Sequence, residues 1–459
     1  MSGLSARGET AAGTRALALG MFFWLAGVVI FWPAVASFAD DVGYLGEARL
    51  LTEGHLRPQP ADVGTWQNGV SKYPLLPSVL LAPLLVVWPR AVFALGIAAA
   101  LVICWLAGRV LESWGDDPAW ALLLLAHPTI VLIARTATAD LPQCAFMLGA
   151  WWCLRRNRWG PTIACCAGLF AVKATGVMLG AALLGGEMLR RLPALRRGER
   201  EARVALFTAA AAFAVGIAAV IVCNELSAGR AWFGYDFGGV RPFSLSHFSS
   251  TAPLQLLNVV VIPPLLIAGA SPFWQRREYG PLAVIAGFGG AMCFYFFVDF
   301  GANRLESLVL APRLLLPVIV FLLIGYADLL ARLLRRVTGR AAIVRGLLIA
   351  GALSAAFAIG VPHARQQRPA GQALAAAERI ARDRGVAEIG LVAEADKPGI
   401  MFSGRVSRAD RTAPRQAVLL CSSRSASHRA PLPEGSQSCD LPGYRAAYQA
   451  DGFFVMTRD

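Results

Sequence analysis

Residues 17–44 have the sequence LALGMFFWLAGVVIFWPAVASFADDVGY. An apolar run of about 20 residues can cross the roughly 30 Å hydrocarbon core of a bilayer, where a helix satisfies its own backbone groups. The run leads directly to two adjacent acids, Asp40 and Asp41. The stretch therefore predicts a membrane span, near 17–38, that brings two carboxylates to the membrane surface. A cleaved signal peptide is the alternative, and we disfavour it because its apolar part is usually shorter.

The composition of the whole chain is also that of a membrane protein. Of 459 residues, 56% are hydrophobic and 16% charged, and the mean hydropathy is +0.54. The net charge of +14 suggests a nucleic-acid partner, but the basic residues are spread over many loops without an aromatic-interleaved stripe. The nine cysteines form no CxxC pair, which disfavours a zinc site or a disulfide-dense scaffold. We therefore expect a polytopic α-helical membrane protein and no nucleic-acid partner.

Eight further apolar stretches are long enough to be membrane spans. They lie near residues 90–110, 118–135, 140–154, 204–224, 253–273, 280–298, 312–331 and 342–361. Two more stretches are ambiguous. Residues 73–89 contain four prolines, which argues against one straight buried helix, and residues 161–190 are too long for one span and short for two.

The positions of the arginines resolve both ambiguous stretches, because short cytoplasmic loops carry an excess of Lys and Arg. If every basic cluster faces the cytoplasm, 161–172 and about 175–189 form a hairpin with Lys173 near its outer tip. The segment 73–89 then lies on the outer face. This gives about eleven spans, a cytoplasmic N-terminus and an outer C-terminus. The clusters are Arg155/Arg156/Arg158, Arg190/Arg191/Arg196/Arg197/Arg200/Arg203, Arg276/Arg277 and Arg332/Arg335/Arg336/Arg340/Arg345.

The chain becomes polar and arginine-rich after the last apolar stretch, which divides it into a transmembrane domain at 1–362 and a small α+β domain at 363–459. We expect the second domain to lie outside the membrane. Its two cysteines, Cys421 and Cys439, can form a disulfide in an oxidising compartment, and two free thiols are the alternative. Its expected elements are a helix from Ala373 to Arg384 and strands at Ile389–Val392, Ala417–Leu420 and Gly452–Met456.

Acidic residues at membrane depth mark functional sites by default. Asp40 and Asp41 open the predicted first outer loop, 39–72, and Asp140 lies at another outer boundary, before Pro142. One of the first two can be a general base whose neighbour positions it. A solvated helix end for Asp40 and Asp41, and a helix cap for Asp140, are the structural alternatives.

Four cations lie at the same predicted boundaries: Lys72, Lys173, Arg304 and Arg313. Two of them are among only three lysines in the chain, although lysine can also snorkel to an interface without a function. Acids on one part of a cavity and cations on another suit transfer from a lipid phosphate. The base takes the proton of the acceptor, and the cations stabilise the departing phosphate.

Five segments, spread over roughly residues 17–335, resemble motifs of the GT-C superfamily of polyprenyl-phosphate-sugar-dependent glycosyltransferases. The similarity is to the branch that holds the protein O-mannosyltransferases and the lipid A aminoarabinose transferases. One difference is Asp41, where that branch usually has Glu. The segments are Asp40-Asp41-Val42-Gly43-Tyr44, Ser71-Lys72-Tyr73-Pro74-Leu75, Thr136-Ala137-Thr138-Ala139-Asp140-Leu141-Pro142, Gly168-Leu169-Phe170-Ala171-Val172-Lys173-Ala174-Thr175-Gly176 and Pro312-Arg313-Leu314-Leu315-Leu316-Pro317.

The resemblance implies a role for each of these residues. Asp40 is expected to be the catalytic base, Asp41 its acidic neighbour and Asp140 a second acid that orients the acceptor or the base. A divalent cation (Mg, Mn or Ca) is possible, with Asp41 and Asp140 as its ligands. It also implies that Lys72, Lys173 and Arg313 bind the donor phosphate. From its position at the same boundary as Arg313, Arg304 is expected to bind this phosphate too, and Tyr44 and Tyr73 are expected to contact the acceptor or the sugar.

The sequence therefore predicts an inverting glycosyltransferase of a bacterial inner membrane. Its expected donor is a polyprenyl-phosphate-linked monosaccharide, and its acceptor is a hydroxyl group of a lipid, glycan or protein. A secondary transporter is one alternative, but no second copy of the Asp40 or Lys173 segment indicates inverted repeats. A membrane scaffold whose tail binds a partner is the other.

Overall fold

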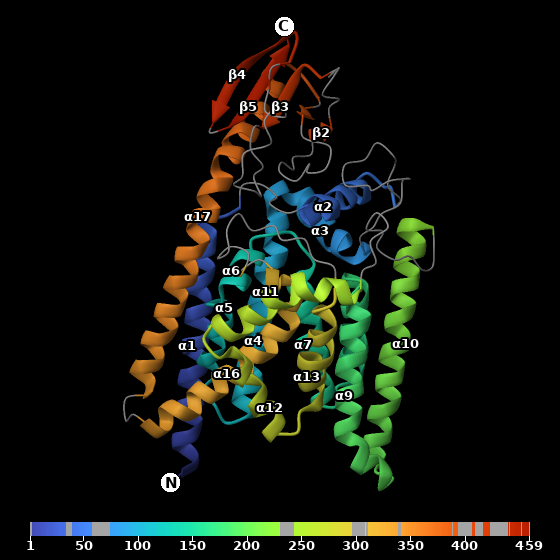
Figure 1. Ribbon diagram of the computed structural model, residues 1–459, viewed down its shortest axis with the longest axis vertical. Helices are drawn as coiled ribbons and strands as arrows, with labels where there is room; N and C mark the ends of the chain where they lie inside the picture. Colours follow the sequence, from blue (N-terminus) through green and yellow to red (C-terminus); the bar gives the residue numbers. More distant parts are fainter. Residues whose placement is uncertain are drawn as a thin grey trace.

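The structure is a computed structural model of the chain (Figure 1). It describes residues 2–33, 39–56, 74–229, 243–295, 308, 311–337, 341–387, 389–392, 406–408, 416–422, 439, 441–450 and 452–458.

Helices make up most of the described chain. Eleven of the named segments are α1 (Ser2–Ile30), α2 (Ala39–Thr52), α3 (Leu75–Val87), η1 (Pro89–Phe93), α4 (Ala94–Ser113), η2 (Pro118–Ala121), α5 (Leu122–Leu125), α6 (Pro128–Ile133), α7 (Asp140–Arg155), α8 (Trp159–Val172) and α9 (Gly176–Arg196). The segments that follow are α10 (Arg200–Ala228), η3 (Leu245–His247), α11 (Phe248–Val261), η4 (Leu266–Ala270), α12 (Ser271–Gln275), α13 (Tyr279–Ala283), η5 (Val284–Phe288), α14 (Gly289–Met292), η6 (Ala311–Leu315), α16 (Leu316–Val337) and α17 (Ala341–Asp383).

Several of these helices are long and apolar enough to cross a bilayer. In the described residues, four helices meet the length and composition expected of a membrane span. A fifth candidate is a pair of helices, Leu245–Val261 and Leu266–Gln275, with a bend of 78° between them. The chain is therefore a multi-pass membrane protein. The count of about eleven spans stays a prediction. The four straight spans are Ala12–Ile30, Arg90–Ser113, Arg200–Ser227 and Pro312–Arg336.

Proline determines where two of the predicted spans break. The stretch 118–135 is divided into η2, α5 and α6, and His127 between α5 and α6 has extended backbone, φ −74° and ψ 126°. Pro128 causes this, because proline disfavours helical backbone in the residue before it. The bend after α11 contains Pro263 and Pro264, which lack the N–H groups that a continuous helix needs.

The two stretches that were ambiguous in the sequence, 161–190 and 73–89, have different structures. Helices α8 and α9 form the predicted hairpin, and Lys173 between them is extended, with φ −157° and ψ 142°. The proline-rich stretch 73–89 is more regular than expected, because α3 is one helix with Pro83 inside it. Its preceding Pro74 serves as the N-cap, a position at which a missing N–H removes no helical bond.

The described residues of the four arginine clusters lie at one end of the molecule, where several of the arginines have polar partners. Arg155 forms an ion pair with Glu278 at 3.0 Å, and Arg276 forms one with Asp328 at 2.7 Å. Arg191 donates to the Leu154 carbonyl at 2.9 Å. Figure 1 shows the N-terminus at this same end and the C-terminal sheet at the opposite end.

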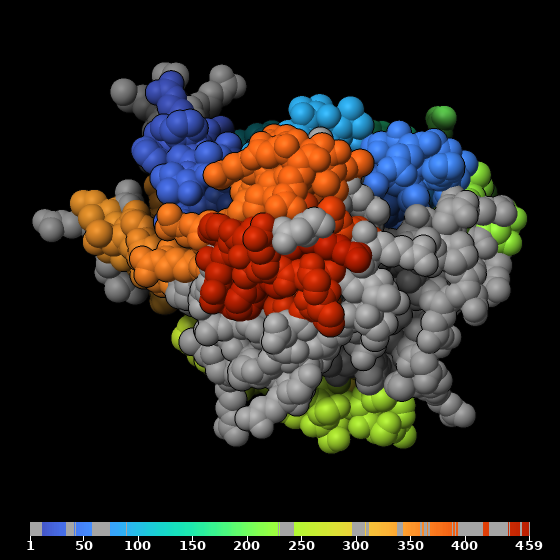
Figure 2. Space-filling view, turned by 90° about the horizontal axis from the view of Figure 1, so that it is seen from above, coloured from blue at the N-terminus to red at the C-terminus, as the bar shows by residue number. Residues whose placement is uncertain are grey.

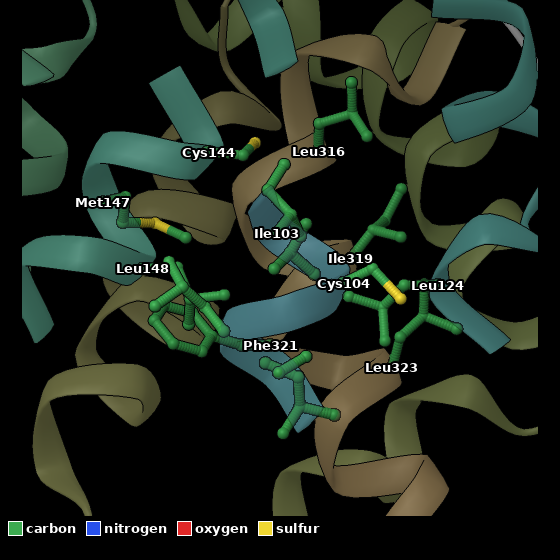
Figure 3. Close-up of a cluster of buried hydrophobic side chains, with 14 of the residues drawn as sticks. Ile103, Cys104, Leu124, Cys144, Met147, Leu148, Leu316, Ile319, Phe321 and Leu323 are labelled. Carbon is green, nitrogen blue, oxygen red and sulfur yellow. The ribbon is translucent and has the colours of Figure 1, made fainter. Parts of the chain in front are cut away.

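The core of the bundle lies between α4, α5, α7 and α16. Figure 3 shows their apolar side chains converging, among them Ile103 of α4, Leu148 of α7 and Phe321 of α16. Helix α16 is buried along most of its length, so it lies at the centre of the bundle. This core sets the relative positions of α4, α6 and α7. The ends of these helices nearer the C-terminal sheet, called their outer ends below, carry the candidate site.

Helix α17 connects the bundle to the C-terminal sheet. At 1.5 Å per residue its 43 residues span about 65 Å, so one helix joins the predicted span at 342–361 to the predicted helix at 373–384. In the sheet the strand order is β2-β1-β3-β5-β4, with β2, β1 and β3 parallel and β5 and β4 antiparallel. The strands are β1 (Ile389–Val392), β2 (Val406–Arg408), β3 (Val418–Ser422), β4 (Tyr444–Ala450) and β5 (Phe453–Arg458).

Side-chain alternation in β3 gives the sheet two apolar faces. Val418 and Leu420 pack with Ala373 and Ala377 of α17, whereas Leu419 and its neighbours pack on the other face, as the two-residue period of a strand requires. A disulfide joins Cys421 and Cys439, whose Cα atoms are 5.8 Å apart. Figure 2 shows the sheet (red), the end of α17 (orange) and the N-terminal helices (blue) on one face of the molecule.

Candidate active site

Helix α2 places the first acidic motif against the outer end of the bundle. Tyr44, Leu45 and Ala48 are buried with Phe93, which follows from their helical spacing of three and four residues. Asp41 lies on the same side, one turn earlier, and is fully buried (0% exposed). A carboxylate at such a position needs polar partners from the protein.

The partner of Asp41 comes from the loop between α6 and α7. Its Oδ1 accepts a hydrogen bond from the backbone N–H of Ala137 at 3.0 Å, although 96 residues separate the two. The Thr136 hydroxyl donates to the Ile133 carbonyl at 2.7 Å and lies 2.9 Å from the Thr138 hydroxyl. The loop is therefore held by its own hydrogen bonds, and it fixes one oxygen of the Asp41 carboxylate.

The second predicted acid begins the helix that follows this loop. Asp140 is in the first turn of α7, where a carboxylate is favourable at the positive end of the helix dipole. It also forms an ion pair with the ammonium of Lys173, between α8 and α9. One turn further along α7, the Gln143 amide donates to the Thr175 hydroxyl at 3.0 Å. These contacts join the outer ends of α7 and α9.

The structure thus brings together three of the predicted site residues through one short loop. Asp41 is bound at Ala137, and Asp140, three residues later, is bound to Lys173. Arg313 is half-buried in η6, directly before α16. Helix α6, which leads into the loop, packs against η6. Arg313 is therefore placed near the same outer region by the elements that carry it.

Of the remaining predicted site residues, one packs among apolar side chains, and the others lie wholly or partly outside the described residues. Tyr44 is only 3% exposed and packs among apolar side chains, so its contact with an acceptor or a sugar stays a prediction. The side chain of Asp40 and the whole of Lys72, Tyr73 and Arg304 lie outside the described residues.

Helix α2 carries a buried acid that was not predicted from the sequence. Glu47 is 7% exposed, and its Oε2 accepts a hydrogen bond from the Ser78 hydroxyl of α3 at 3.0 Å. Burial raises the pKa of the Glu47 carboxyl well above its usual range, and the bond from Ser78 lowers it in part. A serine in the otherwise apolar run 75–87 was the available signal. The pair fastens α2, and with it Asp41, to α3.

The divalent cation that the resemblance allowed stays a prediction. Among the described residues, no group of three or more His, Cys, Asp or Glu side chains is arranged for a metal. Asp140, one of the two ligands that the resemblance suggests, forms an ion pair with the ammonium of Lys173.

Comparison with family models and with curated proteins finds no match to this sequence. Comparison of folds finds ArnT from Cupriavidus metallidurans. Its crystal structure bound to undecaprenyl phosphate aligns over 97% of this chain and 98% of its own, with a TM-score of 0.56 and 13% sequence identity. The chain has the GT-C fold. The apo structure of the same ArnT aligns over 81% of this chain and 72% of its own, with a TM-score of 0.47 and 16% sequence identity.

The GT-C fold agrees with the arrangement that the sequence motifs predicted. The alignment covers nearly the whole chain, so it includes the helical bundle and the part that bears the sheet. Within this fold, α2, the loop before α7 and the α8–α9 break meet at the outer end of the bundle.

Proposed function

We propose that the chain is an inverting glycosyltransferase that uses a polyprenyl-phosphate-linked monosaccharide. The observation that supports this most directly is the linkage of Asp41 to Ala137 and of Asp140 to Lys173. It gives one region two carboxylates and a cation, which the chemistry of lipid-phosphate transfer requires. The likeness in fold to ArnT bound to undecaprenyl phosphate supports a donor of this lipid class.

In this proposal a hydroxyl oxygen of the acceptor attacks the anomeric carbon of the donor sugar. The new carbon–oxygen bond forms as the bond to the phosphate oxygen breaks, with inversion at that carbon. Asp40 takes the proton of the acceptor hydroxyl, and Asp41 and Asp140 position the reacting groups. The polyprenyl phosphate leaves as an anion, stabilised by Lys72, Lys173, Arg304 and Arg313.

The burial of Asp41 supports a positioning role for this residue. Its Oδ1 is engaged by the Ala137 N–H, and the side chain has no exposed surface. Such a carboxylate is poorly placed to meet a substrate hydroxyl and well placed to set the orientation of the first turn of α2. Asp40 is the adjacent residue in that turn, and we assign it the role of base.

We propose that the site faces the outer side of a bacterial inner membrane. Two observations and one general rule support this orientation. The four arginine clusters lie at the end opposite the sheet, short loops rich in arginine remain in the cytoplasm, and the sheet domain carries a disulfide, which persists in an oxidising compartment.

Release of polyprenyl phosphate by the purified protein tests this proposal. We expect the protein in detergent to release undecaprenyl phosphate from a lipid-linked monosaccharide in the presence of a hydroxyl acceptor. A panel of sugars, followed by mass spectrometry of both products, would identify the donor and the acceptor class. Uptake of solute into proteoliposomes, without release of the lipid phosphate, would instead support a transporter.

A further inference from the structure

One buried charged residue at the outer end of the bundle has no assigned role in the proposed reaction. Arg135, in the loop between α6 and α7 that binds Asp41, is only 4% exposed. Among the described residues its guanidinium forms no ion pair with a carboxylate. Burying a charged group without a counter-ion is unfavourable, and an ionisable residue at such a depth marks a function by default.

The guanidinium of Arg135 joins two helices that are distant in sequence. Its Nη2 donates to the Phe31 carbonyl at 2.7 Å, and its Nη1 donates to the Gly360 carbonyl at 3.3 Å. Phe31 directly follows α1, whose last carbonyls lack helical partners and lie at the negative end of the helix dipole. Gly360 belongs to α17, the helix that carries the sheet.

A second contact holds the same loop from the side of α4. A Cβ atom added to Gly96 would lie 2.8 Å from the Ala134 carbonyl oxygen and 2.9 Å from that of Thr136. The loop therefore rests directly on the backbone of α4, with Arg135 fastening it to α1 and α17. Two residues beyond Arg135, the Ala137 N–H donates to Asp41.

We propose that Arg135 is a positioning residue that holds the loop between α6 and α7 against α1 and α17. Its two hydrogen bonds fix the backbone at residue 135, and this places the Ala137 N–H to meet Asp41 and sets the start of α7 at Asp140. Because Gly360 lies within α17, the geometry of the site depends on the helix that carries the sheet. The activity readout of this proposal rests on the proposed function, whereas its structural readout does not.

Substitution of Arg135 by Met removes both hydrogen bonds and keeps an unbranched side chain of similar length. We expect amide hydrogen exchange in a peptide covering 134–141 to become roughly tenfold faster, because the loop opens locally. We also expect kcat to fall by about ten- to a hundredfold, with the KM for the lipid donor within about twofold, because a misplaced group lowers turnover more than binding.

Two further variants separate positioning from general stabilisation. Arg135→Lys keeps a charged donor and should restore part of kcat, with exchange between that of the wild type and that of Arg135→Met. Arg109→Met is the matched control, because Arg109 pairs with Glu112 of the same helix, α4, and 46% of its side chain is exposed. It should change neither kcat nor exchange at 134–141.

The contact between α1 and α17 can be disturbed without a substitution in the loop itself. A Cβ atom at Gly27 of α1 would lie 2.8 Å from the ring of Phe357 on α17. Gly27→Val should therefore move α17 and raise exchange at 134–141 by about threefold or more. Gly346→Val is its control, because Gly346 lies on α17 with nothing within 4 Å of an added Cβ.

The outcomes distinguish this proposal from the proposed function. If the wild type releases no lipid phosphate, the proposed function fails, and exchange at 134–141 still tests Arg135. Unchanged exchange in Arg135→Met, or a loss of stability with normal kcat per folded molecule, would mean that Arg135 only caps α1. If Arg135→Met does not fold, unchanged exchange in both Arg135→Lys and Gly27→Val would overturn the proposal.

Discussion

The Lys173 ammonium forms an ion pair with the Asp140 carboxylate, and this pair joins the break between α8 and α9 to the first turn of α7. Only 16% of the lysine side chain and 4% of the aspartate side chain are exposed. Without a donor bound, the cation predicted to bind phosphate is thus neutralised by a predicted catalytic acid. A donor phosphate reaching Lys173 would compete with Asp140 for it and release that carboxylate.

Removing the lysine of this ion pair should lower the stability of the fold. We expect Lys173→Met to reduce the free energy of unfolding by about 3 kcal/mol, because it leaves a buried carboxylate without its partner. The decrease can be measured by thermal unfolding in detergent. The exposed pair of Arg197 and Glu199 provides the control, and Arg197→Met should have little effect.

Removing both partners separates stability from donor binding. The double variant Asp140→Asn with Lys173→Met should recover much of the lost stability, because no unpaired charge remains. Binding of undecaprenyl phosphate should still be weaker than in the wild type, by about tenfold or more. Wild-type affinity in the double variant would argue against Lys173 as a phosphate ligand.

The neutral analogue of Asp41 should fold normally and turn over slowly. Asp41→Asn keeps a side-chain oxygen that can accept from the Ala137 N–H, so we expect a melting temperature close to that of the wild type. Loss of the charge beside the proposed base should lower kcat by about a hundredfold. Asp41→Leu should also lose stability, because it leaves the buried Ala137 N–H without this acceptor. Equal turnover in Asp41→Asn and the wild type would contradict the assigned role.

The local patterns in the sequence were sufficient to predict most of the elements that carry the site. The extended break at Lys173 followed from the length of 161–190 together with arginine placement, and the first strand of the sheet, Ile389–Val392, from its short apolar run. The strand Tyr444–Ala450 was missed. It lies at the sheet edge and is mostly exposed, so its sequence lacks the apolar alternation of a half-buried strand.

The contacts that organise the site could not be predicted in the same way, because they join segments far apart in the chain. The hydrogen bond from Ala137 to Asp41 spans 96 residues, and those from Arg135 to Phe31 and Gly360 span 104 and 225. A periodic pattern reports which face of a helix is buried. It does not report which distant carbonyl or carboxylate meets that face.

At the opposite end of the molecule, a buried acid should make stability depend on pH. Burial, and then the neighbouring Asp328 carboxylate, raise the pKa of Asp116 to about 7, although Arg335 opposes the shift. The raised pKa means that the folded state holds a proton that the unfolded state loses near its ordinary value of 3.8. Stability should therefore decrease as the pH rises between these two values and level off above about 7.

We expect unfolding to require about 1 kcal/mol less at about pH 8 than at about pH 6. Asp116→Asn, which cannot ionise, should reduce this difference, and the melting temperature measured at both pH values tests it. Glu112→Gln, an acid at the end of the preceding helix, serves as the control. A slope that is the same in Asp116→Asn as in the wild type would exclude Asp116 as its source.

The disulfide should stabilise the sheet domain. Cys421 and Cys439 are 18 residues apart, and closing a loop of this length contributes about 3 kcal/mol in the chain-entropy model. The variant with both cysteines changed to serine should therefore be cleaved faster by protease between these positions. Reductant should have the same effect on the wild type and none on the variant. Cleavage of the wild type at the same rate with and without reductant would show that the bond does not stabilise the domain.

Asp40 is the proposed base of a transfer from a polyprenyl-phosphate sugar, and the rate of lipid-phosphate release by Asp40→Asn tests this role most directly. The control is Glu53→Gln, because Glu53 lies just beyond the end of α2 and forms an exposed pair with Arg49. We predict that Asp40→Asn lowers release by about 10²–10⁴-fold, with wild-type thermal stability, and that Glu53→Gln is as active as the wild type. Release at the wild-type rate by Asp40→Asn would exclude Asp40 as the base.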